Sequence, residues 1–262
     1  MTLSQRSYTQ SVKEIKLPKI DASMKQQEVG SELRRAFRGV VGQISWVAGM
    51  SRPDAAFNAC SLSTVQSKAT YRDFFEANKA VRDLKSNDLD IIIPCMDLST
   101  LNISVYSDAS YGNLKDGGSQ GGHIVFISDS KGTCAPISWS SKKIKRVGRS
   151  TLGAETLSAV DALDSAYLVA KILTELVDVN EREIATSLFT DNKSLYDALN
   201  TSNLLLDKRL RVDISALREM NDRGEVSYHW VESSQQLADV LTKRGASKRK
   251  LFGVLSQANL DN

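Results

Sequence analysis

The sequence predicts an α/β fold, with one mixed five-stranded sheet flanked by helices and preceded by a small helical segment. Apolar residues recur at helical spacing between residues 31 and 86, which indicates the helical segment. Between residues 102 and 140 the pattern changes to short alternating runs separated by turn residues, which is typical of antiparallel strands. After residue 150 helical and strand patterns alternate, and such units usually pair their strands in parallel through right-handed crossovers.

The first third of the chain has a polar start followed by three expected helices. Residues 19–30 read as a linker. The helices are expected at 31–50, 53–65 and 70–86. Pro53 separates the first two, because proline is tolerated in the first turn of a helix but not in its interior.

The sheet is expected to contain a three-stranded meander followed by two strands that come after helices. Ser150 or Thr151 can cap the long helix between the third and fourth strands. The strands are predicted at 102–109, 121–128, 135–140, 184–190 and 226–231, and the later helices at 151–177, 191–200, 208–223 and 233–243. The predicted spatial order of the strands is 3-2-1-4-5, which makes the first and fourth strands neighbours.

Four acidic residues, far apart in the chain, occupy comparable places in these elements. Asp108 lies late in the first strand, within VYSDASYG, and Glu155 lies in the first turns of the long helix. Asp191 ends the fourth strand and Asp239 falls in the last predicted helix. Each alone could be a turn, cap or solvent-facing residue. Together, in the predicted strand order, they indicate one shared site.

A shared site of carboxylates needs a positive partner. Carboxylates that lie close together repel each other, and their pKa values rise. A divalent cation removes this conflict, and ligands that are all oxygen atoms suit Mg²⁺, or Mn²⁺, rather than zinc. Two such ions can activate a water molecule and stabilise the leaving oxygen during phosphodiester cleavage. We therefore expect a site for two Mg²⁺ ions, with ligands from Asp108, Glu155, Asp191 and Asp239.

Basic residues form three clusters, although the formal net charge is only +3. Clusters of this kind suit phosphate backbones, although each alone could simply be the solvated end of a helix or a tail. The third cluster lies between residues 243 and 250. The first two supply the candidate nucleic-acid-binding residues Lys142, Lys143, Lys145, Arg146, Lys208, Arg209 and Arg211.

Membrane proteins and disulfide-rich secreted proteins are the classes that the composition disfavours. The chain has no run of about 18 apolar residues, and its first ten residues lack an apolar signal core. Cys60, Cys95 and Cys134 fit neither a metal-binding spacing nor a disulfide framework. We expect an intracellular protein, in the cytoplasm or nucleus, with no membrane partner.

Several motifs resemble the C-terminal part of Ty1/copia-type retrotransposon Pol polyproteins. VYSDAS at 105–110, ISWSSKK at 137–143, STLGAE at 150–155, TDN at 190–192 and QLADVLTK at 236–243 resemble, in order, that family's YSDAD, ISWSSKKQ, SSTEAE, DN and QLADxLTK. FRGVVG at 37–42 and SRPDAAF at 51–57 resemble the segments that join its reverse transcriptase to its ribonuclease H domain.

This resemblance implies a ribonuclease H-like fold and cleavage of the RNA strand of RNA–DNA hybrids. By motif, Asp108 would bridge both ions, Glu155 and Asp191 would hold the ion on the leaving-group side, and Asp239 would hold the ion that activates water. The expected partners are the hybrid and the reverse transcriptase portion of the parent polyprotein. If the parent element is active, the location would be a virus-like particle.

The resemblance also implies a division of the chain into four segments. These are the end of the reverse transcriptase palm with a linker at 1–30, a thumb-like helical connection at 31–90, a ribonuclease H-like domain at 100–245, and a basic C-terminal tail at 246–262. No YxDD-type motif occurs in the sequence, so we expect no polymerase active site in this chain.

Some positions depart from the family pattern, and two other functions stay open. His123 replaces a usual tyrosine, and Arg211 stands where the family has a histidine, so any role of either side chain in the site is undecided. Gly153 replaces a glutamate that is not a metal ligand. The chain could instead be a non-catalytic nucleic-acid-binding remnant, or a structural piece that functions only when joined to its polymerase.

Overall fold

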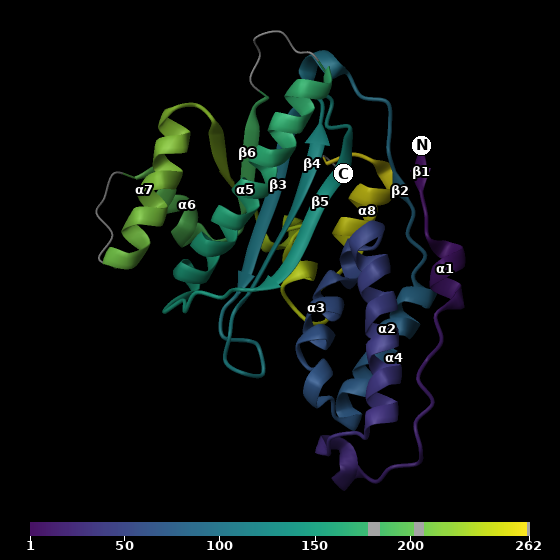
Figure 1. The fold of residues 1–262 in the computed structure, drawn as a ribbon. Helices are drawn as coiled ribbons and strands as arrows, with labels where there is room; N and C mark the ends of the chain where they lie inside the picture. Colours follow the sequence, from purple (N-terminus) through teal and green to yellow (C-terminus); the bar gives the residue numbers. More distant parts are fainter. Residues whose placement is uncertain (178–183, 202–206, 261–262) are drawn as a thin grey trace. The chain divides into compact units, whose positions relative to one another are not determined.

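The computed structural model describes residues 1–177, 184–201 and 207–260 (Figure 1). The chain divides into two compact units: Thr2–Asp90 forms one, and Ile91–Asn262 together with Met1 forms the other. Within the described ranges, no helix combines the length and the apolar character needed to cross a membrane. Cys60, Cys95 and Cys134, which all lie in the described ranges, form no disulfide.

The unit Thr2–Asp90 is helical, with a short β1 at Thr2–Leu3. Its α-helices are α1 (Arg6–Ser11), α2 (Ser31–Met50), α3 (Ala56–Thr64) and α4 (Tyr71–Ser86), and its 3-10 turns are η1 (Ala22–Gln26), η2 (Pro53–Ala55) and η3 (Gln66–Lys68). Thr70 and Asp73 form a capping box that begins α4. The Phe37 and Phe74 rings pack 4.9 Å apart in the core. The predicted helical segment is confirmed.

The second unit contains the predicted sheet. Its strands are β3 (Asn102–Ser110), β4 (Gln120–Ser128), β5 (Cys134–Lys143), β6 (Thr186–Thr190) and β7 (Val226–Trp230), preceded by β2 (Ile91–Ile92) and η4 (Leu98–Thr100). The order is β5-β4-β3-β6-β7, which is the predicted 3-2-1-4-5 order. Strands β3, β4 and β5 pair antiparallel, whereas β6 pairs in parallel with both β3 and β7. The predicted fold class is confirmed.

The helices of this unit are α5 (Thr151–Val177), α6 (Lys193–Asn200), α7 (Lys208–Asp222) and α8 (Arg249–Gln257). Helix α5 packs along β3 and β4 (Figure 1). Ile103 and Val105 of β3 share a buried apolar core with Ala159 and Leu163 of α5. Side chains alternate along a strand, so this packing assigns the odd-numbered residues of β3 to the α5 side. Asp108 therefore projects from the opposite face.

The predicted helix at 233–243 is wrong. The segment contains only two short 3-10 turns, η5 (Ser233–Gln235) and η6 (Asp239–Leu241). Between them the side-chain amide of Gln236 donates to the Ser107 carbonyl of β3 and accepts from the Ala238 backbone N–H. A side chain that competes for backbone groups in this way favours turns over an α-helix.

The expected basic tail contains an α-helix. Leu251, Val254 and Leu255 of α8 are buried. Their spacing of three and four residues is helical, but the three basic residues at 248–250 hid this pattern. Residues 261–262 of the expected tail lie outside the described residues.

Candidate metal centre

Three of the four predicted acidic residues come together at one end of the sheet. Tyr106 of β3 pairs with Phe189 of the parallel strand β6. Asp108 and Asp191 each follow two residues later, so their side chains emerge at the same edge. Glu155 reaches this edge from the beginning of α5. One carboxylate oxygen from each of Asp108, Glu155 and Asp191 lies within 4.8 Å of the other two.

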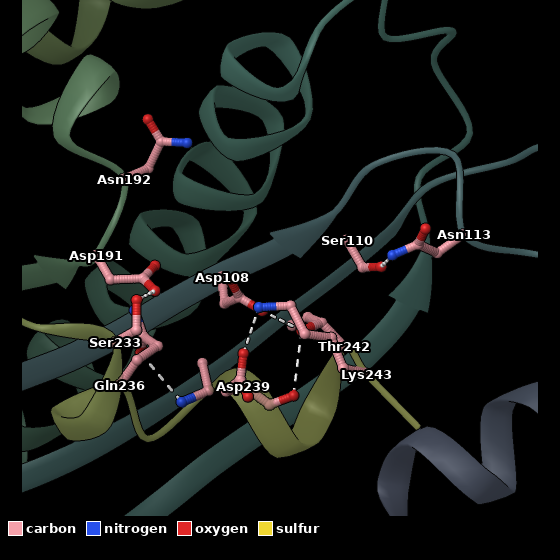
Figure 2. Close-up of polar contacts among 12 residues, drawn as sticks. Asp108, Ser110, Asn113, Asp191, Asn192, Ser233, Gln236, Asp239, Thr242 and Lys243 are labelled. Carbon is pink, nitrogen blue, oxygen red and sulfur yellow. Dashed lines mark hydrogen bonds and ion pairs between the residues drawn. The ribbon is translucent and has the colours of Figure 1, made fainter. Parts of the chain in front are cut away.

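Asn192, and not Asp191, is the N-cap residue of α6. The side-chain oxygen of Asn192 accepts from the Leu195 backbone N–H at 2.9 Å and so begins α6. The Asp191 carboxylate instead accepts a hydrogen bond from the Ser233 hydroxyl at 2.7 Å. Its backbone carbonyl accepts from the Trp230 indole N–H at 3.1 Å. Figure 2 shows the Asp191 carboxylate with Ser233 beside it and Asp108 on the neighbouring strand.

The three carboxylates line an open hollow of about 340 Å³, whose rim includes Tyr111 and Lys243. The side chains differ in their access to solvent. Asp108 is 1% exposed and Glu155 is 4% exposed, whereas Asp191 is half-buried. A ligand in the hollow would therefore meet two carboxylates that water scarcely reaches.

Burial and mutual repulsion disfavour the charged forms of these acids. Burial raises the pKa of Asp108, with Lys243 and the Thr242 hydroxyl acting in the opposite direction. Burial, with the nearby carboxylates of Asp108 and Asp191, raises the pKa of Glu155 to about 9. The buried Oε2 atom of Glu155 has no hydrogen-bond partner among the residues that the structure describes.

This donor set fits a divalent cation. Its ligand atoms are all carboxylate oxygens, which hard cations such as Mg²⁺ and Mn²⁺ prefer. A cation would satisfy the unpaired Glu155 oxygen and remove the repulsion that raises the pKa values of Asp108 and Glu155. Asp108, Glu155 and Asp191 are the residues that could hold it.

The fourth predicted ligand, Asp239, is connected to this group through a lysine. Asp239 is the first residue of η6 and does not belong to the cluster of three carboxylates. Its Oδ1 atom pairs with the ammonium of Lys243, and the Lys243 Nζ lies 3.6 Å from Asp108 Oδ2 (Figure 2). Burial opposes the charge of Lys243, but Asp108 and Asp239 outweigh it and raise the pKa of Lys243 to about 12.

The segment 236–243 also supplies residues that position the site. The Thr242 hydroxyl donates to Asp108 Oδ2, and the Gln236 amide ties the segment to β3. Sequence reasoning took only Asp239 from the QLADVLTK motif and counted Lys243 with the surface basic residues. The signal that could have revealed the others was the grouping of polar side chains around Asp239 in a single motif.

Gly122 allows this segment to approach β3. Gly122 is the cross-strand partner of Asp108 in β4. A Cβ atom added at Gly122 would lie 2.7 Å from the Leu241 Cβ and 2.8 Å from the Thr242 Cγ2. Only glycine leaves room for η6 and the residues that follow it at this distance from Asp108.

The predicted nucleic-acid-binding residues lie on two neighbouring surfaces. Arg146 pairs with Asp213 of α7 at 3.1 Å, which brings the segment after β5 next to α7. Lys143 pairs with Asp116, whereas Lys142 is exposed. The first surface carries Lys142, Lys143, Lys145 and Arg146, and the second carries Lys208, Arg209 and Arg211.

His123 does not join the carboxylate group. It pairs with Ser107 across β3 and β4, and Ser107 donates to Ser158 of α5, so His123 lies on the α5 side of the sheet. Burial, assisted by Lys142, lowers the pKa of His123 to about 4. Arg211 lies in α7, two residues before Asp213, the partner of Arg146. Arg211 thus lies on the same helix as the partner of Arg146.

Replacing Gly122 by alanine is expected to lower the free energy of unfolding by about 1–3 kcal/mol, because the added Cβ overpacks against Leu241 and Thr242. Urea denaturation measures this change. Gly253→Ala is the matched control, because a Cβ at Gly253 meets no atom within 4 Å. Equal stability of the two variants would contradict the close approach of residues 241–242 to β4.

Glu155→Gln is expected to change how the stability of the metal-free protein depends on pH. A raised pKa means that the folded state holds the Glu155 proton more tightly than the unfolded state does. Wild-type stability should therefore fall, relative to the glutamine variant, as pH rises from about 4.5 toward about 9. One proton corresponds to a difference in slope of at most about 1.4 kcal/mol per pH unit.

Urea denaturation in chelator across this pH range measures the difference between wild type and Glu155→Gln. Glu175→Gln, which changes an exposed residue of the same helix, is the control and should follow wild type. If the free energies of unfolding of wild type and Glu155→Gln changed in parallel with pH, burial would not raise the pKa of Glu155.

Comparison with known proteins connects this site to a family. No family model matches the chain. The retrovirus-related Pol polyprotein from transposon RE2 of Arabidopsis thaliana is 30% identical over 210 residues, covering 79% of this chain and 14% of that polyprotein. The transposon Ty1-ER2 Gag-Pol polyprotein of Saccharomyces cerevisiae is 29% identical over 150 residues, covering 55% of this chain and 8% of that polyprotein.

Among solved structures, LC11-RNase H1 in complex with an RNA/DNA hybrid is 14% identical, with a TM-score of 0.40 over 54% of this chain and 94% of that chain. That protein was isolated from compost by a metagenomic approach. The chain thus spans a small part of the length of the polyproteins that it matches. The 30% identity to the RE2 polyprotein over 79% of this chain shows that the chain belongs to the Ty1/copia-type retrotransposon Pol polyproteins, and its strand order is that of the ribonuclease H-like fold that its motifs imply.

Proposed function

We propose that this chain cleaves the RNA strand of RNA–DNA hybrids, as the ribonuclease H portion of a Ty1/copia-type Pol polyprotein. The observation that carries the proposal is the group of Asp108, Glu155 and Asp191 at the edge of the sheet. Perturbed acids in an open hollow are typical of functional sites. Homology to Pol polyproteins supports the choice of this reaction.

The proposed cofactor is Mg²⁺, with Mn²⁺ as an alternative. Divalent ions held by carboxylates supply an activated water and stabilise the leaving oxygen of a phosphodiester. Asp108 would be shared between two ions, Glu155 and Asp191 would hold the ion on the leaving-group side, and Asp239 would hold the other. The chain's own contribution is to fix these side chains: Ser233 orients Asp191, and Thr242 orients Asp108.

We propose that the two basic surfaces bind the hybrid. Lys142 and Lys145 are exposed beside the segment that leads into α5, the helix that carries Glu155. Lys208 and Arg209 are exposed in the first turn of α7. Phosphate contacts from these side chains would position the duplex, and contacts to 2′-hydroxyl groups would select the RNA strand.

The remaining segments have proposed places in the parent polyprotein. Residues 1–30 would be the end of the reverse transcriptase palm and a linker, and 31–90 the thumb-like connection. The ribonuclease H-like domain would span 100–245, followed by a C-terminal segment at 246–262. The reverse transcriptase portion of the parent polyprotein is the proposed protein partner.

Asp108→Asn is expected to lower cleavage of a labelled RNA–DNA hybrid by at least about 1,000-fold, because it removes a charged ligand that both ions would share. Hybrid binding and the unfolding transition should change little. Asp164→Asn, an exposed position on α5, is the control and should cut like wild type.

The same assay, run with Mg²⁺ and with chelator, separates the alternatives. Wild-type protein that binds the hybrid without cutting it would indicate a non-catalytic binding remnant. Protein that neither binds nor cuts would indicate a piece that depends on its polymerase. An Asp108→Asn protein that still cuts would refute the site.

Replacing Lys142 and Lys145 by alanine should weaken hybrid binding and flatten its dependence on salt. Each phosphate contact contributes roughly 0.9 to the slope of log K against log salt concentration, so the slope should fall by up to about 1.8. Fluorescence anisotropy at several salt concentrations measures it. The charge-matched control replaces Lys131, in the turn at the other end of the β4–β5 hairpin, and Lys171, late in α5. An unchanged slope would argue against this surface.

A further inference from the structure

Lys243 is the residue of the QLADVLTK motif that places a positive charge against the carboxylates of two proposed ligands at once. Its ammonium pairs with Asp239 Oδ1 and lies 3.6 Å from Asp108 Oδ2 (Figure 2). No function proposed so far uses this cation. Its position nevertheless coincides with the place where the proposed function needs positive charge, between Asp108 and Asp239.

The surroundings of Lys243 hold its ammonium in this place. Thr242, the residue before Lys243, donates its hydroxyl hydrogen bond to Asp108 Oδ2. Gly122 lets this part of the chain lie close to β3. The negative charges of Asp108 and Asp239 outweigh the burial of Lys243. An ammonium that satisfies two partly desolvated carboxylates competes directly with any other cation for the same oxygens.

The Lys243 side chain can also leave. It is 41% exposed, whereas the Asp108 side chain is 2% exposed. Lysine carries its charge on a four-carbon stem with many rotamers, so the ammonium can move into solvent while the stem stays in contact with the protein. One carboxylate oxygen each of Asp108, Glu155 and Asp191 already lies within 4.8 Å of the other two. The ion pairs of Lys243 are with Asp108 and Asp239, so only Asp108 is common to the two groups.

We propose that Lys243 is a built-in counter-cation that occupies the second ion position and must be displaced before a second divalent ion binds. This inference rests on the two-ion site of the proposed function. The first ion binds to Asp108, Glu155 and Asp191 without displacing Lys243. The second ion binds between Asp108 and Asp239 only when the ammonium has moved away, so the two positions fill in order and with different affinities.

Metal binding without nucleic acid tests this proposal. Isothermal titration of the chelator-treated full chain with Mn²⁺ should show one tight site and one weaker site in wild type. In Lys243→Met the second site should bind Mn²⁺ at least about tenfold more tightly, because the ammonium no longer competes for the Asp108 and Asp239 oxygens. Partly buried charged pairs of this kind are stronger than exposed ones. The affinity of the first site should change much less.

Lys193→Met is the matched control, because Lys193 also pairs with an aspartate four residues away. It should leave both Mn²⁺ affinities at the wild-type values. Asp239→Asn provides an independent measurement with the lysine intact. It should abolish the weaker site and keep the tight one, whether or not Lys243→Met folds in the absence of metal.

The outcomes separate this inference from the proposed function. A second-site affinity that is the same in wild type and in Lys243→Met would overturn the role of Lys243 and leave the function in place. Two sites that persist in Asp239→Asn would also overturn it. Failure of wild type, Lys243→Met and Lys193→Met to bind any Mn²⁺ would overturn the metal site itself, and with it both proposals.

Discussion

The arrangement of residues around the site depends on one constraint: carboxylates lie close together where water scarcely reaches them. Oxygens of Asp108, Glu155 and Asp191 lie within 4.8 Å of one another, and two of these side chains are almost completely buried. Like charges at such distances disfavour ionisation, and burial adds to this effect. A protein keeps such an arrangement when a positive partner compensates for it, so the surrounding contacts are best understood as the means of placing that partner.

Sheet topology and one close contact create this crowding. The parallel pairing of β3 with β6 brings Asp108 and Asp191 to the same edge, and the crossover helix α5 delivers Glu155. The segment that carries Asp239 arrives differently. It passes over β4 where Gly122 offers no side chain, and its polar groups hydrogen-bond to β3. Two neighbouring strands and the helix packed on them thus supply three acids, and a short irregular segment supplies the fourth together with a lysine.

Basic residues have two separate roles in this arrangement. Most of those near the site, such as Lys142 and Lys208, are exposed and suit the long-range attraction of a polyanion. Lys243 is half-buried and pairs with Asp108, which lines the hollow, and with Asp239. The same residue type therefore occurs exposed on the basic surfaces and half-buried beside the acids, where Lys243 compensates their charge.

Local patterns in the sequence were sufficient for the strands and the long helices, because periodicity and turn residues act over a few neighbours. The short connections and the preference for right-handed crossovers then favoured the observed strand order. They also placed Asp108 beside Asp191, since strand order determines which strand ends meet. They did not predict that 233–243 forms turns, that Lys243 lies among the acids, or that Gly122 is required. Those features depend on contacts between residues more than 100 positions apart, such as Gln236 with Ser107, and only the folded chain brings such groups together.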